Sequence, residues 1–160
     1  MKNILNISLL GIFIFSVNLL LSNTDAKGKT QNWSDISEGS FNVKGERRII
    51  PQQDRTVKVN YTELRTELTA APFEFTDRSV NSPFIIELPM PNGNLSKFYV
   101  TEYSMMEPGL SAKFPEFKTY SVKGIDDPYA AGKIDITLTG FHAMVLTPNG
   151  SYFIDPYSSD

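Results

Sequence analysis

Alternating apolar and polar residues dominate the second half of the chain and predict β-strands there. Residues 84–88 and 95–103 form two such runs. Residues 91–93 (Pro-Asn-Gly) lie between them, and they combine a proline that fixes one dihedral angle with a glycine that accepts a left-handed one. The two runs therefore predict an antiparallel hairpin.

The strongest alternation follows in residues 133–139 and 141–146, on either side of a predicted tight turn at Thr139-Gly140. Apolar residues occupy both faces of the run 141–146, which is typical of a central strand. A second Pro-Asn-Gly turn leads into the short run 151–154. These three runs predict a three-stranded antiparallel meander. Weaker strand patterns also cover residues 41–50 and 117–122.

A helical pattern begins after Asn60, which is a favourable N-cap residue. Four residues at helical spacing share one face of this helix: Tyr61, Leu64, Leu68 and Ala71. Pro72 ends it, because a proline disfavours the helical conformation of the residue before it. Residues 107–114 predict one further helical turn. The predicted fold is therefore α+β and mainly β, an antiparallel hairpin plus a three-stranded meander with one or two short helices.

The first 26 residues are organised like a secretory signal peptide. Lys2 precedes a long apolar run, and small residues near Ala26 suit a cleavage site, with Ser22 as an alternative site. An uncleaved membrane anchor is the alternative interpretation of residues 1–26. We therefore expect a secreted protein, extracellular or held at the cell surface, with no stable membrane span after signal cleavage.

The next segment, residues 27–40, is polar and contains only two apolar anchors, Trp33 and Ile36. This composition predicts a flexible linker or a loosely docked arm. Residues 41–160 then form the β-rich domain, and they are long enough to build one hydrophobic core.

Composition narrows the functional classes. The formal net charge of −3 offers no basic surface for nucleic acid. The chain has no cysteine, so no disulfide framework supports it despite the predicted export. Stability must then come from core burial, for which eleven phenylalanines and seven tyrosines supply apolar area.

The usual catalytic constellations are absent from the sequence. There is no cysteine nucleophile, and His142 is the single histidine, whereas a catalytic zinc usually takes three ligands rich in histidine. No H-E-x-x-H, G-x-S-x-G, G-x-G-x-x-G or phosphate-loop motif occurs. His142 follows Phe141 in a predicted strand, and we interpret it as a structural histidine. We expect no enzyme activity and no cofactor in these 160 residues.

Two charged pairs are candidate sites. Asp126 and Asp127 precede Pro128 in a predicted loop, where such carboxylates cap turns, bind a cation or act as an acid/base pair. The pair Arg47-Arg48 is a candidate processing site, and a solvated basic pair is the alternative interpretation.

Several blocks in a fixed order resemble the pro-region of secreted bacterial zinc metalloproteases of the reprolysin-like (adamalysin-type) class. The blocks span residues 87–93, 106–110, 113–116, 118–120, 124–128, 140–144 and 152–156. The resemblance covers roughly residues 41–160 and implies a precursor in which a catalytic domain with H-E-x-x-H-x-x-G-x-x-H follows this domain. No such motif occurs here, so we expect a fragment or a truncated precursor, with the zinc bound in the absent catalytic domain.

The resemblance implies that the domain keeps its partner, the metalloprotease catalytic domain, latent and assists its folding. Animal relatives often ligate the zinc through a cysteine, which this chain lacks. Two mechanisms remain: an edge strand lies in the substrate cleft by β-augmentation, or Asp126 or Asp127 places a carboxylate on the zinc.

Two other functional classes stay open at this point. The first is a free-standing secreted or cell-surface binding or adhesion module, with Tyr99 and Tyr103 as an aromatic platform. The second is a hydrolase that uses Asp126, Asp127 and His142.

Overall fold

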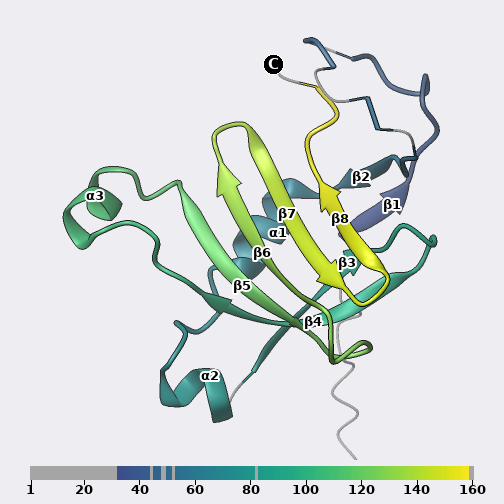
Figure 1. The fold of residues 1–160 in the computed structure, drawn as a ribbon. Coiled ribbons are helices and arrows are strands. Elements are labelled where there is room, and N and C mark those ends of the chain that lie inside the picture. Colours follow the sequence, from purple (N-terminus) through teal and green to yellow (C-terminus); the bar gives the residue numbers. More distant parts are fainter. Residues whose placement is uncertain (1–31, 44, 48–49, 52, 82, 159–160) are drawn as a thin grey trace, which may run out of the picture. The chain divides into compact units, whose positions relative to one another are not determined.

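A six-stranded antiparallel sheet forms the body of the structure (Figure 1), and each strand pairs with the next one in the sequence. The strands are β3 (Phe84–Pro89), β4 (Leu95–Glu102), β5 (Lys118–Gly124), β6 (Ala131–Thr137), β7 (Gly140–Thr147) and β8 (Gly150–Ile154). The α+β, mainly β fold is thus confirmed. The predicted hairpin is β3–β4 and the predicted meander is β6–β8, and β5 joins the two into one sheet.

This computed structural model describes residues 32–43, 45–47, 50–51, 53–81 and 83–158. All of them belong to one compact unit. The predicted signal peptide and Arg48 lie outside the described residues. Within the described residues, no helix is long and apolar enough to cross a membrane.

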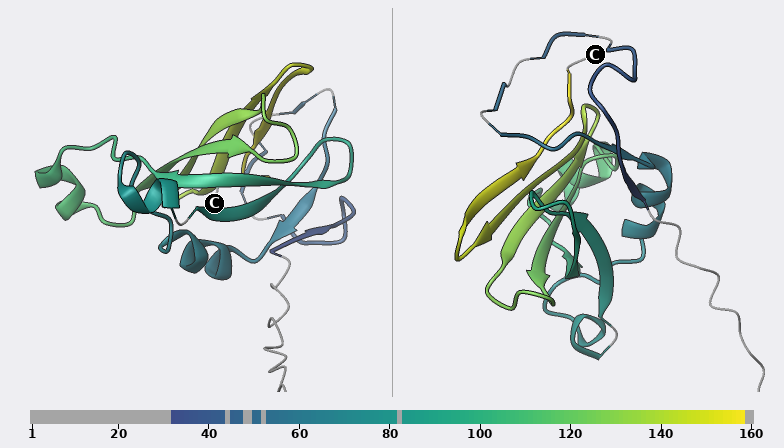
Figure 2. Two further views of the ribbon diagram at one scale, coloured as in Figure 1. Left: turned by 90° about the horizontal axis from the view of Figure 1, so that it is seen from below. Right: turned by 90° about the vertical axis from the view of Figure 1, so that its right-hand side faces the viewer.

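One face of the sheet carries the hydrophobic core. Each strand turns alternate residues to this inner face, where the largest fully buried side chains of the sheet are Phe98, Tyr120, Ile86, Leu88, Ile134, Ile136, Val100 and Val145. Helix α1 (Tyr61–Leu68) adds Leu64 and Leu68 to the same cluster. Figure 2 shows α1 and the small β1–β2 pair on this one side of the sheet.

The outer face is less covered than the sequence predicts. Strand β7 has two neighbours, as expected for a central strand, but only its inner residues are buried. Met144 and Leu146 on the outer face are 43% and 49% exposed. The expected β6 residue Leu138 lies instead in the turn after Thr137 and is 77% exposed. Alternation therefore predicted strand β7 correctly, but the burial that it predicted for the outer face of β7 is wrong.

Local chemistry explains the helices. The Asn60 side chain accepts a hydrogen bond from the Glu63 backbone N–H, as an N-cap should. The predicted turn at 107–114 is helix α3 (Pro108–Lys113), with proline at its first position. Helix α2 (Asp77–Asn81) was not predicted, because it buries no residue and so leaves no apolar period in the sequence.

The predicted flexible linker is partly wrong. Within residues 27–40, strand β1 (Trp33–Asp35) pairs antiparallel with β2 (Val57–Val59). Trp33 is 3% exposed, its ring meets Phe141 edge-on at 5.4 Å, and its indole N–H donates to the Glu87 carbonyl at 2.9 Å. The packing of one large side chain orders a segment whose composition is polar. Residues 27–31 lie outside the described residues.

The predicted strand at residues 41–50 is also wrong for the residues described there. Of these, only Glu46 makes a β-bridge, and Gly45 has a φ of +85°, which interrupts an extended run. Phe41 instead packs edge-on against Tyr157, with ring centroids 5.1 Å apart. Side-chain contacts rather than a ladder therefore hold this segment.

Stability should fall steeply between pH 10 and pH 12. Burial raises the pKa of Tyr120 from 10.0 to about 12, so in this window the unfolded chain loses a proton that the folded chain retains. Burial raises the pKa of Tyr152 to about 12 as well, so Tyr120→Phe should reduce this loss rather than remove it, as measured by urea midpoints from pH 9 to pH 12. Tyr99→Phe, at a half-exposed tyrosine of the outer face, controls for the loss of a tyrosine hydroxyl. Parallel profiles for the wild type and Tyr120→Phe would contradict the assignment.

Candidate functional site

The two edges of the sheet differ in their free main-chain groups. Met90 and Asn94 form a hydrogen-bonded pair next to the turn, and along β3 every second residue repeats this pairing with β4. The main-chain groups of the residues between them, Ile85, Glu87 and Pro89, therefore point away from β4. Pro89 has no N–H to donate, and the Glu87 carbonyl already accepts the Trp33 indole N–H. The β3 edge is therefore partly closed to another strand.

The edge of β8 is open. Thr147 and Gly150 flank a two-residue turn and form a hydrogen-bonded pair, so the N–H and C=O groups of Ser151 and Phe153 point away from β7. No other strand pairs with β8 among the described residues. Two outward N–H donors and two carbonyl acceptors are thus available to an added strand.

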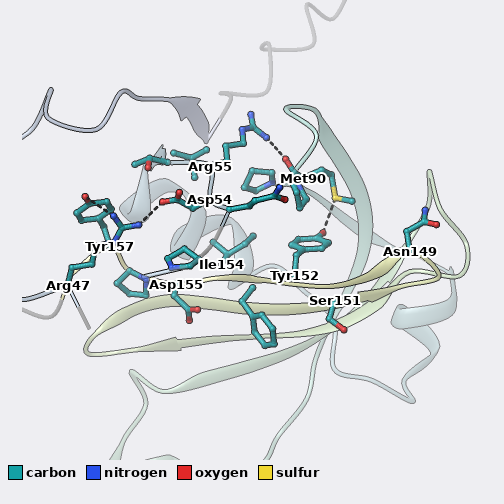
Figure 3. Close-up of a pocket in the computed structure, with 18 residues that line it drawn as sticks. Arg47, Asp54, Arg55, Met90, Asn149, Ser151, Tyr152, Ile154, Asp155 and Tyr157 are labelled. Carbon is teal, nitrogen blue, oxygen red and sulfur yellow. Dashed lines mark hydrogen bonds and ion pairs between the residues drawn. The ribbon is translucent and has the colours of Figure 1, made fainter. Parts of the chain in front are cut away.

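A groove of about 890 Å³ runs beside this edge, and we call it the β8 groove. One wall is residues 151–157, and the other is residues 53–57, which lead into β2. Pro89, Met90 and Pro91 line it where β3 ends. Figure 3 shows Tyr152 and Met90 close together within the groove, with Arg47, Asp54 and Tyr157 gathered toward one end.

Arg47 holds one end of the β8 groove together. Its guanidinium pairs with Asp54 at 2.6 Å and with Glu38 at 3.0 Å, and it lies over the Tyr157 ring at 4.5 Å. The hydrogen bond that Arg47 donates to Asp54 raises the pKa of Arg47 above its ordinary value. This side chain therefore ties residues before β2 to residues after β8.

The other end is fixed by two contacts to Met90. The Tyr152 hydroxyl donates to the Met90 sulfur at 2.9 Å, and Arg55 donates to the Met90 carbonyl at 2.7 Å. Arg55 also pairs with Asp35 of β1 at 2.7 Å. These contacts join both walls of the groove to the turn between β3 and β4.

The carboxylates of Asp126 and Asp127 both accept backbone N–H groups of the domain. Asp126 accepts the Lys97 backbone N–H at 2.8 Å, and Asp127 accepts the Tyr129 backbone N–H at 3.0 Å. Asp127 thus caps a turn, which is one of the roles open to it in the sequence, whereas Asp126 joins the β5–β6 loop to β4. Asp126 is exposed, so its carboxylate is also accessible to a partner.

His142 belongs to a different cluster. Its Nδ1 lies 3.1 Å from Asp155 and its Nε2 lies 3.2 Å from the Thr139 hydroxyl. In the register of β6 and β7 it faces Asp135, whose pKa burial raises. The hydrolase constellation of Asp126, Asp127 and His142 is therefore not assembled, because the aspartates sit in the β5–β6 loop, beyond the end of β6 that is remote from His142.

The remaining sequence candidates, Arg47, Tyr99 and Tyr103, differ in how accessible their side chains are. Arg47, half of the candidate processing site, has its guanidinium bound in the ion pairs described above. Tyr99 is half exposed on the outer face, whereas the Tyr103 ring is covered by the Lys133 ammonium at 3.9 Å. The two tyrosines therefore do not form an open aromatic pair.

Sequence reasoning did not find the β8 groove. Its walls come from residues about a hundred positions apart, and no periodic signal links residues 53–57 to residues 151–157. The one available hint was the short run 151–154 as the last predicted strand of the sheet, since a final strand lies at an edge.

No protein-family model, no curated protein and no solved structure matches the chain. Among the residues that the structure describes, no three His, Asp or Glu side chains are grouped to hold a metal ion.

Proposed function

We propose that this domain is the pro-domain of a secreted zinc metalloprotease of the reprolysin-like class, and that it keeps the catalytic domain latent and assists its folding. The ordered sequence blocks support the class of protein. The open edge of β8 is the observation that carries the mode of action, because it offers unpaired main-chain donors and acceptors beside a groove.

Pairing at β8 explains latency without a zinc ligand from this chain. Proteases generally bind a substrate in extended form, so a rim strand that pairs with β8 would be covered by the whole domain. In such an arrangement main-chain hydrogen bonds provide the affinity, and the size of the bound domain prevents the substrate from reaching the cleft. The rival mechanism, a carboxylate of Asp126 or Asp127 on the zinc, has less support, because both side chains already accept backbone N–H groups of this chain.

The inhibition constant of residues 27–160 against the separated catalytic domain tests the proposal. Phe153→Pro should weaken inhibition about tenfold, because it removes an outward N–H, and one lost hydrogen bond of about 1.4 kcal/mol corresponds to that factor. Glu87→Pro makes the same change on the β3 edge and should leave the constant unchanged. Thermal melting of both variants controls for folding. Absence of inhibition by the wild-type domain at high excess would sink the proposal.

The same assay separates the two mechanisms. Asp126→Asn and Asp127→Asn keep an acceptor oxygen for the Lys97 and Tyr129 backbone N–H groups and remove the charge that a zinc ion would require. Pairing at β8 predicts unchanged inhibition by both variants. A large loss of inhibition with either asparagine, together with normal inhibition by Phe153→Pro, would favour the carboxylate instead.

A further inference from the structure

We propose that the β8 groove is a receptor that takes up an extended, apolar and basic segment of the partner, so the partner supplies the inserted strand. The proposed function is needed only to name the source of that segment, the catalytic domain. We infer this direction of insertion from the second wall of the groove. Residues 53–57 lie opposite β8, so β8 cannot enter the substrate cleft of a protease by itself. A strand from outside must instead lie between the two walls.

The side chains on the two sides of β8 define what such a segment carries. A strand added to β8 alternates its side chains between the inner and outer faces of the sheet. On the inner side they would meet Val57, Met90 and Ile154, which are half-buried and pack against the core. On the outer side they would lie beside Phe153 and Met144, which are 62% and 43% exposed. Apolar or β-branched residues fit both sides.

The charged residues around the β8 groove indicate the charge of the segment that binds there. Among the residues that the structure describes, the charged ones that line the groove and their ion-pair partners comprise two arginines, Arg47 and Arg55, and four carboxylates. The carboxylates are Asp35, Glu38, Asp54 and Asp155. Two cations against four anions leave an excess of two negative charges while His142 is neutral. The rim therefore favours a lysine or arginine in the bound segment and disfavours an acidic one.

A synthetic peptide tests the receptor without the protease. The probe is acetyl-Val-Thr-Val-Lys-Val-Thr-Val-amide, titrated into residues 27–160 while hydrogen exchange is followed by NMR. We expect slower exchange at the Ser151 and Phe153 amides, with no change along β3. Replacing the lysine with glutamate should raise the dissociation constant about tenfold or more, and methylating alternate peptide nitrogens on the pairing side should abolish binding.

Variants of the domain locate the site. Val57→Arg fills the groove and should weaken binding of the peptide at least tenfold. Tyr99→Arg places the same side chain on the outer face away from the groove and should have no effect. If Val57→Arg lowers the folded fraction, Phe153→Pro provides the same test from the opposite wall.

The outcomes separate this inference from the proposed function. Unprotected Ser151 and Phe153 amides at millimolar peptide overturn the receptor, even if the domain inhibits the protease. Equal binding of the N-methylated peptide also overturns it. Peptide binding with the expected protection, but without inhibition of the catalytic domain, supports the receptor and overturns latency as its role.

Discussion

Replacing Trp33 with alanine should lower the free energy of unfolding by about 3 to 5 kcal/mol, the usual cost of removing a buried large aromatic side chain. Trp33 is 3% exposed, packs against Phe141 and donates its indole N–H to the Glu87 carbonyl. Its loss would leave a cavity between β1 and the sheet and an unpaired carbonyl at the β3 edge. Urea denaturation of the wild type and the variant measures the difference.

Two further variants interpret the Trp33 result. Ser34→Ala changes the exposed neighbour in the same strand and should have little effect. Trp33→Phe retains an aromatic ring but loses the hydrogen bond, so it should fall between the wild type and alanine. An alanine variant as stable as the wild type would show that residues 33–35 are the loose arm that their composition predicts.

Replacing Gly124 with alanine should cost about 3 kcal/mol, through overpacking rather than a cavity. An added Cβ would lie 2.1 Å from the Asp127 carbonyl oxygen and 3.0 Å from the Ala130 Cβ. Because the nearest atom belongs to the backbone, the β5–β6 loop must shift to accept it. The Asp126 cap on Lys97 would shift with the loop, so the variant should also speed hydrogen exchange at the Lys97 amide.

Gly109 provides the matched control for that substitution. It lies in helix α3 with nothing within 4 Å of an added Cβ. Gly109→Ala should therefore stabilise the domain by about 0.5 kcal/mol, because alanine loses less backbone freedom on folding. Chemical denaturation of both variants should give shifts of opposite sign, and shifts of the same sign would contradict the packing argument.

The sequence predicted elements whose signal is local. Strand β4 and helix α1 carry clear periods of two and 3.6, and the Asn60 cap is a one-residue signal that the structure reproduces. Strand β1 has only three residues, so no period can emerge from it, and its order comes from a tertiary contact of Trp33. Arg47 shows the same limit, since its partners Glu38, Asp54 and Tyr157 are identified only by the folded structure.

The candidate site was harder to predict than the sheet. Asp126 and Asp127 stood out as adjacent carboxylates, yet Asp126 accepts a backbone N–H of β4 and Asp127 caps a turn. The edge of β8 is open because no other described strand pairs with it. Alternation within residues 151–154 predicts a strand but carries no information about its neighbours. Exposure of Met144 was mispredicted for the same reason, because an apolar side chain in a strand does not say whether another layer lies over it.

Side chains rather than a β-ladder join the two walls of the β8 groove in the part of the chain that the structure describes. Among the described residues, no strand pairing connects residues 53–57 with β8, and side chains such as Arg47 at one end and Met90 with Tyr152 at the other make the joins. The ion pairs of Arg47 stabilise the groove only weakly, because water reaches and screens their charges. A change in the width of the groove therefore requires rearrangement of these side chains and of the half-buried Val57 and Ile154, but it breaks no backbone ladder of the described residues.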